Sequence, residues 1–211
     1  SYFGEKSWEK AESAMLKQCF SLCCDKAKLA PSDLELIFSG DLLNQCVGSA
    51  FAMRDVGVPY FGLYGACSTM GESITLGAMA IDGGYVNRVC AVTSSHFCSS
   101  ERQYRFPLEY GGQRTPSAQR TVTAGAAVVV GKEKGNITVN RITLGSVIDF
   151  LVTDANNMGA AMAPAAADTL SHYFEDTSTV PDDYDMILSG DLGSVGASIP
   201  VSYTHLRAHE T

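Results

Sequence analysis

Apolar and polar positions alternate along the first hundred residues with helical and strand periods in turn. Residues 8–28 carry apolar side chains at the spacing of an amphipathic helix, and helical patterns return over 42–57 and 68–82. Three short apolar runs between and after these helices predict buried strands: LELIFSG (34–40), VPYFGLYG (58–65) and RVCAVTSS (88–95). Strands separated by helices of this length predict a mainly parallel sheet that helices cover on both faces.

The segments that follow change character. TVTAGAAVVVGKE (121–133) and GNITVNRITLGSVI (135–148) predict two strands joined by a Gly-containing turn, forming an antiparallel pair. Residues 100–120 are polar and contain several Gly and Pro residues, so they predict a long excursion. Loops of that length are usually functional or interfacial.

An internal repeat indicates the architecture. PSDLELIFSGDL (31–42) and PDDYDMILSGDL (181–192) are identical at seven of twelve positions, and a helical pattern precedes each, over 8–28 and about 163–176. One supersecondary unit has therefore been duplicated. The prediction is a layered α/β fold built on a duplicated βαβαβαββ unit, with a complete first half in 1–160 and a truncated second half in 161–200.

The two ends of the chain carry an expectation of their own. The chain begins without Met and ends in the polar, unpatterned string VSYTHLRAHET (201–211), which matches a sequencing-library adapter translated in one frame. We therefore expect a fragment whose residues 201–211 are a non-native tail. His205 and His209 fall in that tail, so we assign them to no metal site.

Composition narrows the class of function. A hydrophobic content of 45% is typical of a globular interior, and a net charge of −8 argues against a nucleic-acid partner. The seven cysteines lack paired metal-ligand spacing and the density of a disulfide scaffold, which favours free thiols in a reducing compartment. No apolar run approaches the roughly 20 residues of a membrane span. We expect neither a metal site nor a cofactor.

A duplicated α/β unit with a cysteine after its second strand follows the plan of the thiolase fold. The stretches that narrow the resemblance are GDLLNQ, GACSTMGES, AIDGGYVNRV, TSSH, ERQYRFPLEYGGQRTPSAQRTVTAGAAVVV, MGAAMAPAAADT and PDDYDMILSGDL. Across residues 1–200 the chain resembles the thiolase-like stage V sporulation protein AD family of spore-forming bacteria, so the resemblance implies a thiolase-like fold throughout.

The resemblance also implies a function, which is binding without catalysis. Members of the family bind dipicolinic acid and belong to a membrane-associated complex that moves it, with calcium, into the forespore and out at germination. The implied partners are dipicolinic acid, calcium and the membrane subunits of that complex. The implied location is peripheral, on the cytoplasmic side of the forespore or spore inner membrane. Thiolase-like folds commonly dimerise, so a homodimer is also expected.

Cys67 is the first candidate site residue. It lies between an apolar run and a helical pattern, where the positive end of a helix favours a thiolate and free N–H groups could hold a carboxylate ligand. In thiolase-like enzymes the matching cysteine takes up the acyl group, so the rival hypothesis is an active ketoacyl-synthase-type acyltransferase with Cys67 as its nucleophile. That role also needs a base and an oxyanion hole. A small buried thiol is the structural alternative.

Other candidates follow the ends of the predicted strands. His96 ends RVCAVTSSH, where the carboxyl ends of strands face ligands, although neighbouring serines or backbone could equally satisfy it. Asn44 and Gln45 follow LIFSG and are predicted to line the same edge as ligand-binding residues. Asp41 recurs in the repeat as Asp191, which favours a structural role as a helix N-cap.

Arg114 is the candidate within the polar excursion. A dicarboxylate would bind well to a bidentate guanidinium, so we predict Arg114 as a ligand-binding residue. For any single arginine of this segment, a solvated loop or a subunit interface is the alternative. The others are Arg102, Arg105 and Arg120.

Overall fold

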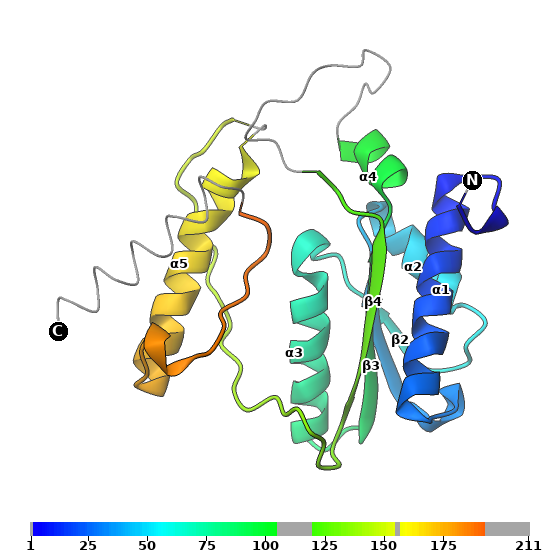
Figure 1. The fold of residues 1–211 in the computed structure, drawn as a ribbon, viewed down its shortest axis with the longest axis horizontal. Coiled ribbons are helices and arrows are strands. Elements are labelled where there is room, and N and C mark those ends of the chain that lie inside the picture. Colours follow the sequence, from blue (N-terminus) through cyan, green and yellow to red (C-terminus); the bar gives the residue numbers. More distant parts are fainter. Residues whose placement is uncertain (1, 105–119, 155–156, 193–211) are drawn as a thin grey trace. The chain divides into compact units, whose positions relative to one another are not determined.

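The computed structural model describes residues 2–104, 120–154 and 157–192 of the chain, which divides into two compact units. The first unit comprises 1–111 and 121–140, and the second comprises 112–120 and 141–211. Among the described residues, the first unit contains the sheet and the α-helices α1 to α4 (Figure 1). The second contains helix α5.

The sheet of the first unit has the strand order β2-β1-β3-β4. Its strands are β1 (Leu36–Gly40), β2 (Tyr60–Gly62), β3 (Arg88–Ser95) and β4 (Ala124–Gly131). The central strand β1 pairs in parallel with both β2 and β3, while β4 runs antiparallel to β3 over eight residue pairs, from Arg88 opposite Gly131 to Ser95 opposite Ala124. The predicted mainly parallel α/β sheet is confirmed.

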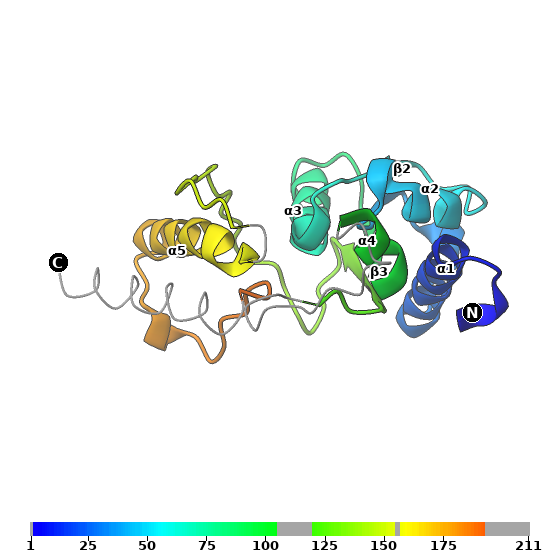
Figure 2. The same cartoon turned by 90° about the horizontal axis from the view of Figure 1, so that it is seen from above.

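Helices cover both faces of this sheet (Figure 2). They are α1 (Trp8–Ala27) and α2 (Val47–Met53) on one face and α3 (Thr69–Asp82) on the other. Helix α4 (Phe97–Tyr104) follows β3 at the end of the sheet (Figure 1). On one face Ile37, Cys90 and Val92 pack with side chains of α1 and α2. On the other face Leu36, Phe38 and Val89 form a second cluster, against which Leu76 and Ile81 of α3 pack. This alternation follows the two-residue period of strands, and it explains why all five residues of β1 are buried.

In the second unit, helix α5 (Met158–Thr177) repeats α1 at an offset of 150 residues. Both helices contain 20 residues, and both end at a left-handed residue, Lys28 (φ 56°) after α1 and Ser178 (φ 53°) after α5. The N-cap side chains correspond as well: Ser7 accepts from the Lys10 amide and Asn157 from the Ala160 amide.

The turn after each helix is also repeated. In the first copy the Ala30 amide donates to Asp33 at 2.8 Å, and in the second the Val180 amide donates to Asp183 at the same distance. Each copy therefore has the same caps and the same turn, which supports the duplication inferred from the sequence.

Three sequence-based predictions need correction. The partner of β4 is β3, and residues 135–148 form no strand; their alternating apolar side chains are largely exposed, with Val147 at 99%. The duplication also predicts a strand in the repeated segment 185–190, which forms none, because the described residues of its unit offer no neighbouring strand to pair with its backbone. The excursion begins later than predicted, since α4 continues to Tyr104.

Gly40, the last residue of β1, marks a point where the backbone allows no side chain. A Cβ atom there would lie 2.1 Å from the Leu63 carbonyl oxygen, which the following loop holds in place. We predict that Gly40→Ala destabilises the chain by about 3 kcal/mol or more in urea unfolding, because backbone must move to relieve the clash. Gly71→Ala on α3, where nothing lies within 4 Å, is the matched control and should be neutral or stabilising by up to about 1 kcal/mol. Equal effects of the two substitutions would contradict this account.

Candidate functional site

The carboxyl ends of β1, β2 and β3 meet at one edge of the sheet, and three segments continue from them: 41–46, 63–68 and 96–104. We call these segments the carboxyl edge. The first two lie side by side, since the Cys46 thiol donates to the Leu63 carbonyl at 2.9 Å. In sheets of this kind the carboxyl ends of the strands are where ligands bind.

Backbone strain gathers at the carboxyl edge. Gln45 (φ 58°), Cys46 (φ 53°) and Ala66 (φ 49°) all have left-handed conformations, which cost a residue with a side chain on the order of 1–2 kcal/mol. Such residues persist only where their surroundings hold them, and they cluster at functional sites.

The carboxylate of Asp41 holds the first of these segments. It is 1% exposed and accepts from the Leu43 amide at 2.7 Å and from the Ser49 amide, in the first turn of α2, at 2.6 Å. The predicted structural role is therefore confirmed, but the predicted N-cap position is wrong: Cys46 is the N-cap, and Asp41 accepts from the first turn of α2 at a separation of eight residues. For Asp191, which is exposed, the corresponding role stays a prediction because the residues beyond 192 lie outside the described chain.

Cys67 lies in the single turn Ala66–Ser68 that leads directly into α3. Its side chain is exposed, so the reading of a small buried thiol is wrong. The turn is fixed by its own hydroxyls, since Ser68 donates to the Gly65 carbonyl and Thr69 to the Ala66 carbonyl, each at 2.8 Å. The structure thus presents the thiol at a helix start, while its role in binding or catalysis stays a prediction.

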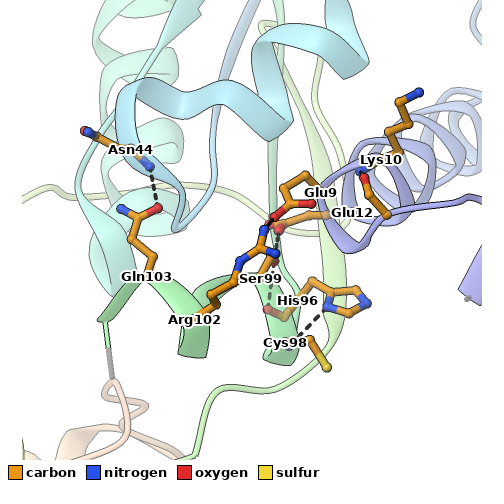
Figure 3. A network of polar contacts seen from close by, with 10 residues as sticks. Glu9, Lys10, Glu12, Asn44, His96, Cys98, Ser99, Arg102 and Gln103 are labelled. Carbon is orange, nitrogen blue, oxygen red and sulfur yellow. Dashed lines mark hydrogen bonds and ion pairs between the residues drawn. The ribbon is translucent and has the colours of Figure 1, made fainter. Parts of the chain in front are cut away.

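Helix α4 fastens the two neighbouring segments. The side-chain oxygen of Gln103 accepts from the backbone N–H of Asn44 at 3.0 Å, as Figure 3 shows. The hydroxyl oxygens of Tyr104 and Tyr64 lie 3.1 Å apart. Burial, the Tyr64 hydroxyl and, to a smaller extent, the charges of Asp41 and Cys67 raise the pKa of Tyr104.

The predicted residues Asn44, Gln45 and Cys67 therefore lie along one edge, and all three are exposed. Nothing in the sequence pattern singles out Tyr64 or Gln103, because the pattern places Tyr64 in a strand and Gln103 in an irregular excursion. Tyr104 interleaves with the arginines of that excursion, which fits an interface or a flat aromatic ligand equally well.

His96 lies at the same edge, but its ring is buried and 1% exposed. Its Nδ1 accepts from the Cys98 amide at 3.2 Å, and burial lowers the pKa of the ring, which favours the neutral form. The His96 carbonyl accepts from the Ser100 amide, so the residue starts α4. This is the environment that the structural alternative expects, and a ligand-binding role for His96 stays a prediction.

The predicted Arg114 lies outside the described residues. Of the other arginines in that segment, Arg102 forms an ion pair with Glu9, and its guanidinium carbon lies 5.3 Å from the centre of the Trp8 ring. These contacts bind α4 to the start of α1 (Figure 3). Arg102 thus has a structural role.

A buried carboxyl, Glu12 of α1, connects three elements behind the edge. Ser94 of β3 donates to one of its oxygens at 3.1 Å and Ser99 of α4 to the other at 2.7 Å. Burial raises the pKa of Glu12 from 4.5 to about 7; the Ser99 hydrogen bond opposes this shift and the charge of Asp41 adds to it. The signal in the sequence is a charged residue within the buried stripe of an amphipathic helix.

Two further observations concern the described residues only. No group of three or more His, Cys, Asp or Glu side chains among them is arranged to hold a metal ion. None of the helices found there combines the length and the apolar character that crossing a membrane requires.

The layered sheet, with the cysteine in the turn before α3, has the thiolase-like fold. Solved structures show the same fold. The TM-score is 0.69 with a 3-oxoacyl-(acyl carrier protein) synthase III of Xanthomonas oryzae, which is 13% identical, with coverage of 97% of this chain and 67% of that one. It is 0.66 with a variant of OleA from Xanthomonas campestris, at 12% identity and coverage of 97% and 66%.

The sequence comparisons identify the family within this class. The family model of stage V sporulation protein AD matches residues 1–209. The stage V sporulation protein AD of Bacillus subtilis (strain 168) is 43% identical over 195 residues, which cover 92% of this chain and 58% of that protein. The chain therefore belongs to the stage V sporulation protein AD family, and it spans less than two thirds of the length of this relative.

The Glu12 environment predicts a particular dependence of stability on pH. The folded chain holds the proton of the Glu12 carboxyl more tightly than the unfolded chain does. The contribution of this proton to the free energy of unfolding is therefore complete below about pH 4.5 and is lost as the pH rises to about 7. Glu12→Gln cannot ionise, so it should become more stable than the wild type by about 2–3 kcal/mol across that window. Urea unfolding at several pH values measures the difference.

The exposed Glu133→Gln is the control for this experiment. The ion pair with Arg88 lowers the pKa of Glu133, so this substitution should leave the pH profile near 7 unchanged. A Glu12→Gln variant that follows the wild-type profile would disprove the assignment.

Proposed function

We propose that this protein binds dipicolinic acid at the carboxyl edge without transforming it. The observation that carries the proposal is membership of the stage V sporulation protein AD family, at 43% identity over 92% of the chain. In this role the protein is the peripheral, ligand-binding component of the sporulation complex that moves dipicolinate with calcium into forespores and out at germination.

The edge offers suitable chemistry for a dicarboxylate. Cys67 lies beside the backbone N–H groups at the start of α3, and such groups bind carboxylates well. Asn44 and Gln45 are exposed on the neighbouring segment and carry amide donors. Arg114 is the proposed guanidinium partner of the second carboxylate.

The partners and location belong to the same proposal. The protein acts with the membrane subunits of the complex on the cytoplasmic side of the forespore or spore inner membrane, and it forms a homodimer. Co-purification with those subunits from sporulating cells, together with light scattering of the isolated protein, tests both parts.

Isothermal titration with dipicolinate tests the binding proposal. We expect saturable binding, weakened about tenfold or more by Cys67→Ala and by the double variant Asn44→Ala/Gln45→Ala, because each removes groups that face the ligand. Cys19→Ala, which removes a thiol from α1, is the matched control and should bind as the wild type does. Folded protein that takes up no dipicolinate would refute the proposal.

An acyltransferase of the ketoacyl-synthase type is the second candidate. The observation that favours it is an exposed thiol at a helix start in a fold shared with condensing enzymes. If it is right, incubation with acyl-coenzyme A should leave an acyl group on Cys67, detectable by mass spectrometry and absent from Cys67→Ser. An unmodified Cys67 in protein that binds dipicolinate would exclude it.

A further inference from the structure

Helix α4 connects the buried Glu12 to the exposed carboxyl edge. Its first turn contains Ser99, which binds Glu12, and its last turn contains Gln103 and Tyr104, which contact Asn44 and Tyr64. Because a helix moves as a unit, a change in the position of Ser99 also moves Gln103 and Tyr104. Their contacts with segments 41–46 and 63–68 of the carboxyl edge therefore change.

The hydroxyl of Ser99 has two acceptors for one hydrogen. Its Oγ lies 2.7 Å from a carboxyl oxygen of Glu12 and 3.0 Å from the His96 carbonyl oxygen. When Glu12 is ionised, its charged oxygen is the stronger acceptor and takes the hydrogen. When Glu12 is protonated, its own O–H can donate to Ser99, and Ser99 can then donate to His96. Protonation therefore allows two hydrogen bonds at the start of α4, from Glu12 to Ser99 and from Ser99 to His96, where the ionised carboxylate allows one.

Two groups of α1 titrate near neutral pH: Glu12, and the thiol of Cys23, whose pKa a hydrogen bond with Cys90 lowers to about 7. Asp41 adds negative charge from the segment after β1, while Arg102 of α4 is paired with Glu9. Glu101 of α4 accepts from Thr121. The other ionisable groups on the strands and α-helices that pack against α1 are those of β3 and α4. They are Arg88, which pairs with Glu133; Cys90, whose pKa is raised by Cys23 and by burial; the thiol of Cys98; and the hydroxyl of Tyr104. The ring of His96 belongs to the residue that joins β3 to α4. Helix α2 and strand β4 contain no ionisable side chain.

We propose that Glu12 is a positioning residue for the ligand site: when it gains a proton, α4 closes on the carboxyl edge and ligand binding strengthens. This inference rests on the proposed function, because it requires a ligand at that edge. Glu12 itself is buried and acts only through Ser99 and α4.

Dipicolinate titration across pH tests the ligand-binding half of the inference. The affinity of the wild type should fall about fivefold or more between about pH 6 and about pH 8, while both ligand carboxylates stay ionised. Glu12→Gln can donate as the protonated acid does, so its affinity should stay at the low-pH value throughout. Glu133→Gln should follow the wild type. Wild-type binding that does not change with pH, or a Glu12→Gln profile identical to that of the wild type, would overturn the inference while leaving the proposed function intact.

Fluorescence of the single tryptophan tests the α4 half without ligand. Trp8 lies under Arg102 of α4, so its emission should report the position of that helix. We expect a transition centred near pH 7 in the wild type that Glu12→Gln and Ser99→Ala abolish and Glu133→Gln keeps. A purely structural role would lower stability in Ser99→Ala but leave this transition in place, and that result would refute the proposal. Absence of dipicolinate binding at every pH would instead refute the proposed function and the predicted effect of Glu12 on ligand binding. The fluorescence would then test only whether protonation of Glu12 moves α4.

Discussion

The buried carboxylate of Asp41 is the interaction on which the carboxyl edge depends. It accepts two backbone N–H groups, one on each side of the left-handed pair Gln45 and Cys46, and so holds a strained loop closed. Gly48 allows this arrangement, since a Cβ atom there would lie 3.2 Å from the carboxylate. With the loop fixed, the backbone N–H of Asn44 donates to Gln103 and so holds α4 against the loop. The Cys46 thiol donates to the Leu63 carbonyl and so holds the segment before Cys67. The same charge also helps to raise the pKa of Glu12.

Much of the first unit could be predicted because local and tertiary preferences agree there. The helix expected over 8–28 occurs as Trp8–Ala27, where a serine cap and a left-handed Lys28 fix its ends, and RVCAVTSS forms β3 as expected. The errors arise where contacts with segments distant in the sequence determine the structure. Strand β4 (Ala124–Gly131) could pair with β3 before it or with the segment after it. It pairs with β3 over eight residue pairs. Short apolar patterns alone do not identify a partner strand.

The candidate site was partly predictable for the same reason. Residues at strand ends, such as Asn44, Gln45 and Cys67, could be located because parallel strands deliver their carboxyl ends to one edge. The orientation of His96 could not be foreseen, since it depends on α4 beginning at the very next residue. Glu12 was overlooked because a single acid inside a helical pattern is ordinarily assigned to the solvent face. Its partners Ser94 and Ser99 follow more than eighty residues later.

The duplicated helix gives Glu12 a further meaning. Since α1 and α5 agree in length, caps and following turn at a constant offset, each residue of one has a defined counterpart in the other. The counterpart of Glu12 is Met162, a side chain of similar reach that can neither bind nor release a proton. The two helices therefore match in length, caps and following turn but differ in electrostatics at this position. The proton-linked behaviour proposed for Glu12 therefore has no counterpart at the matching position of the second copy.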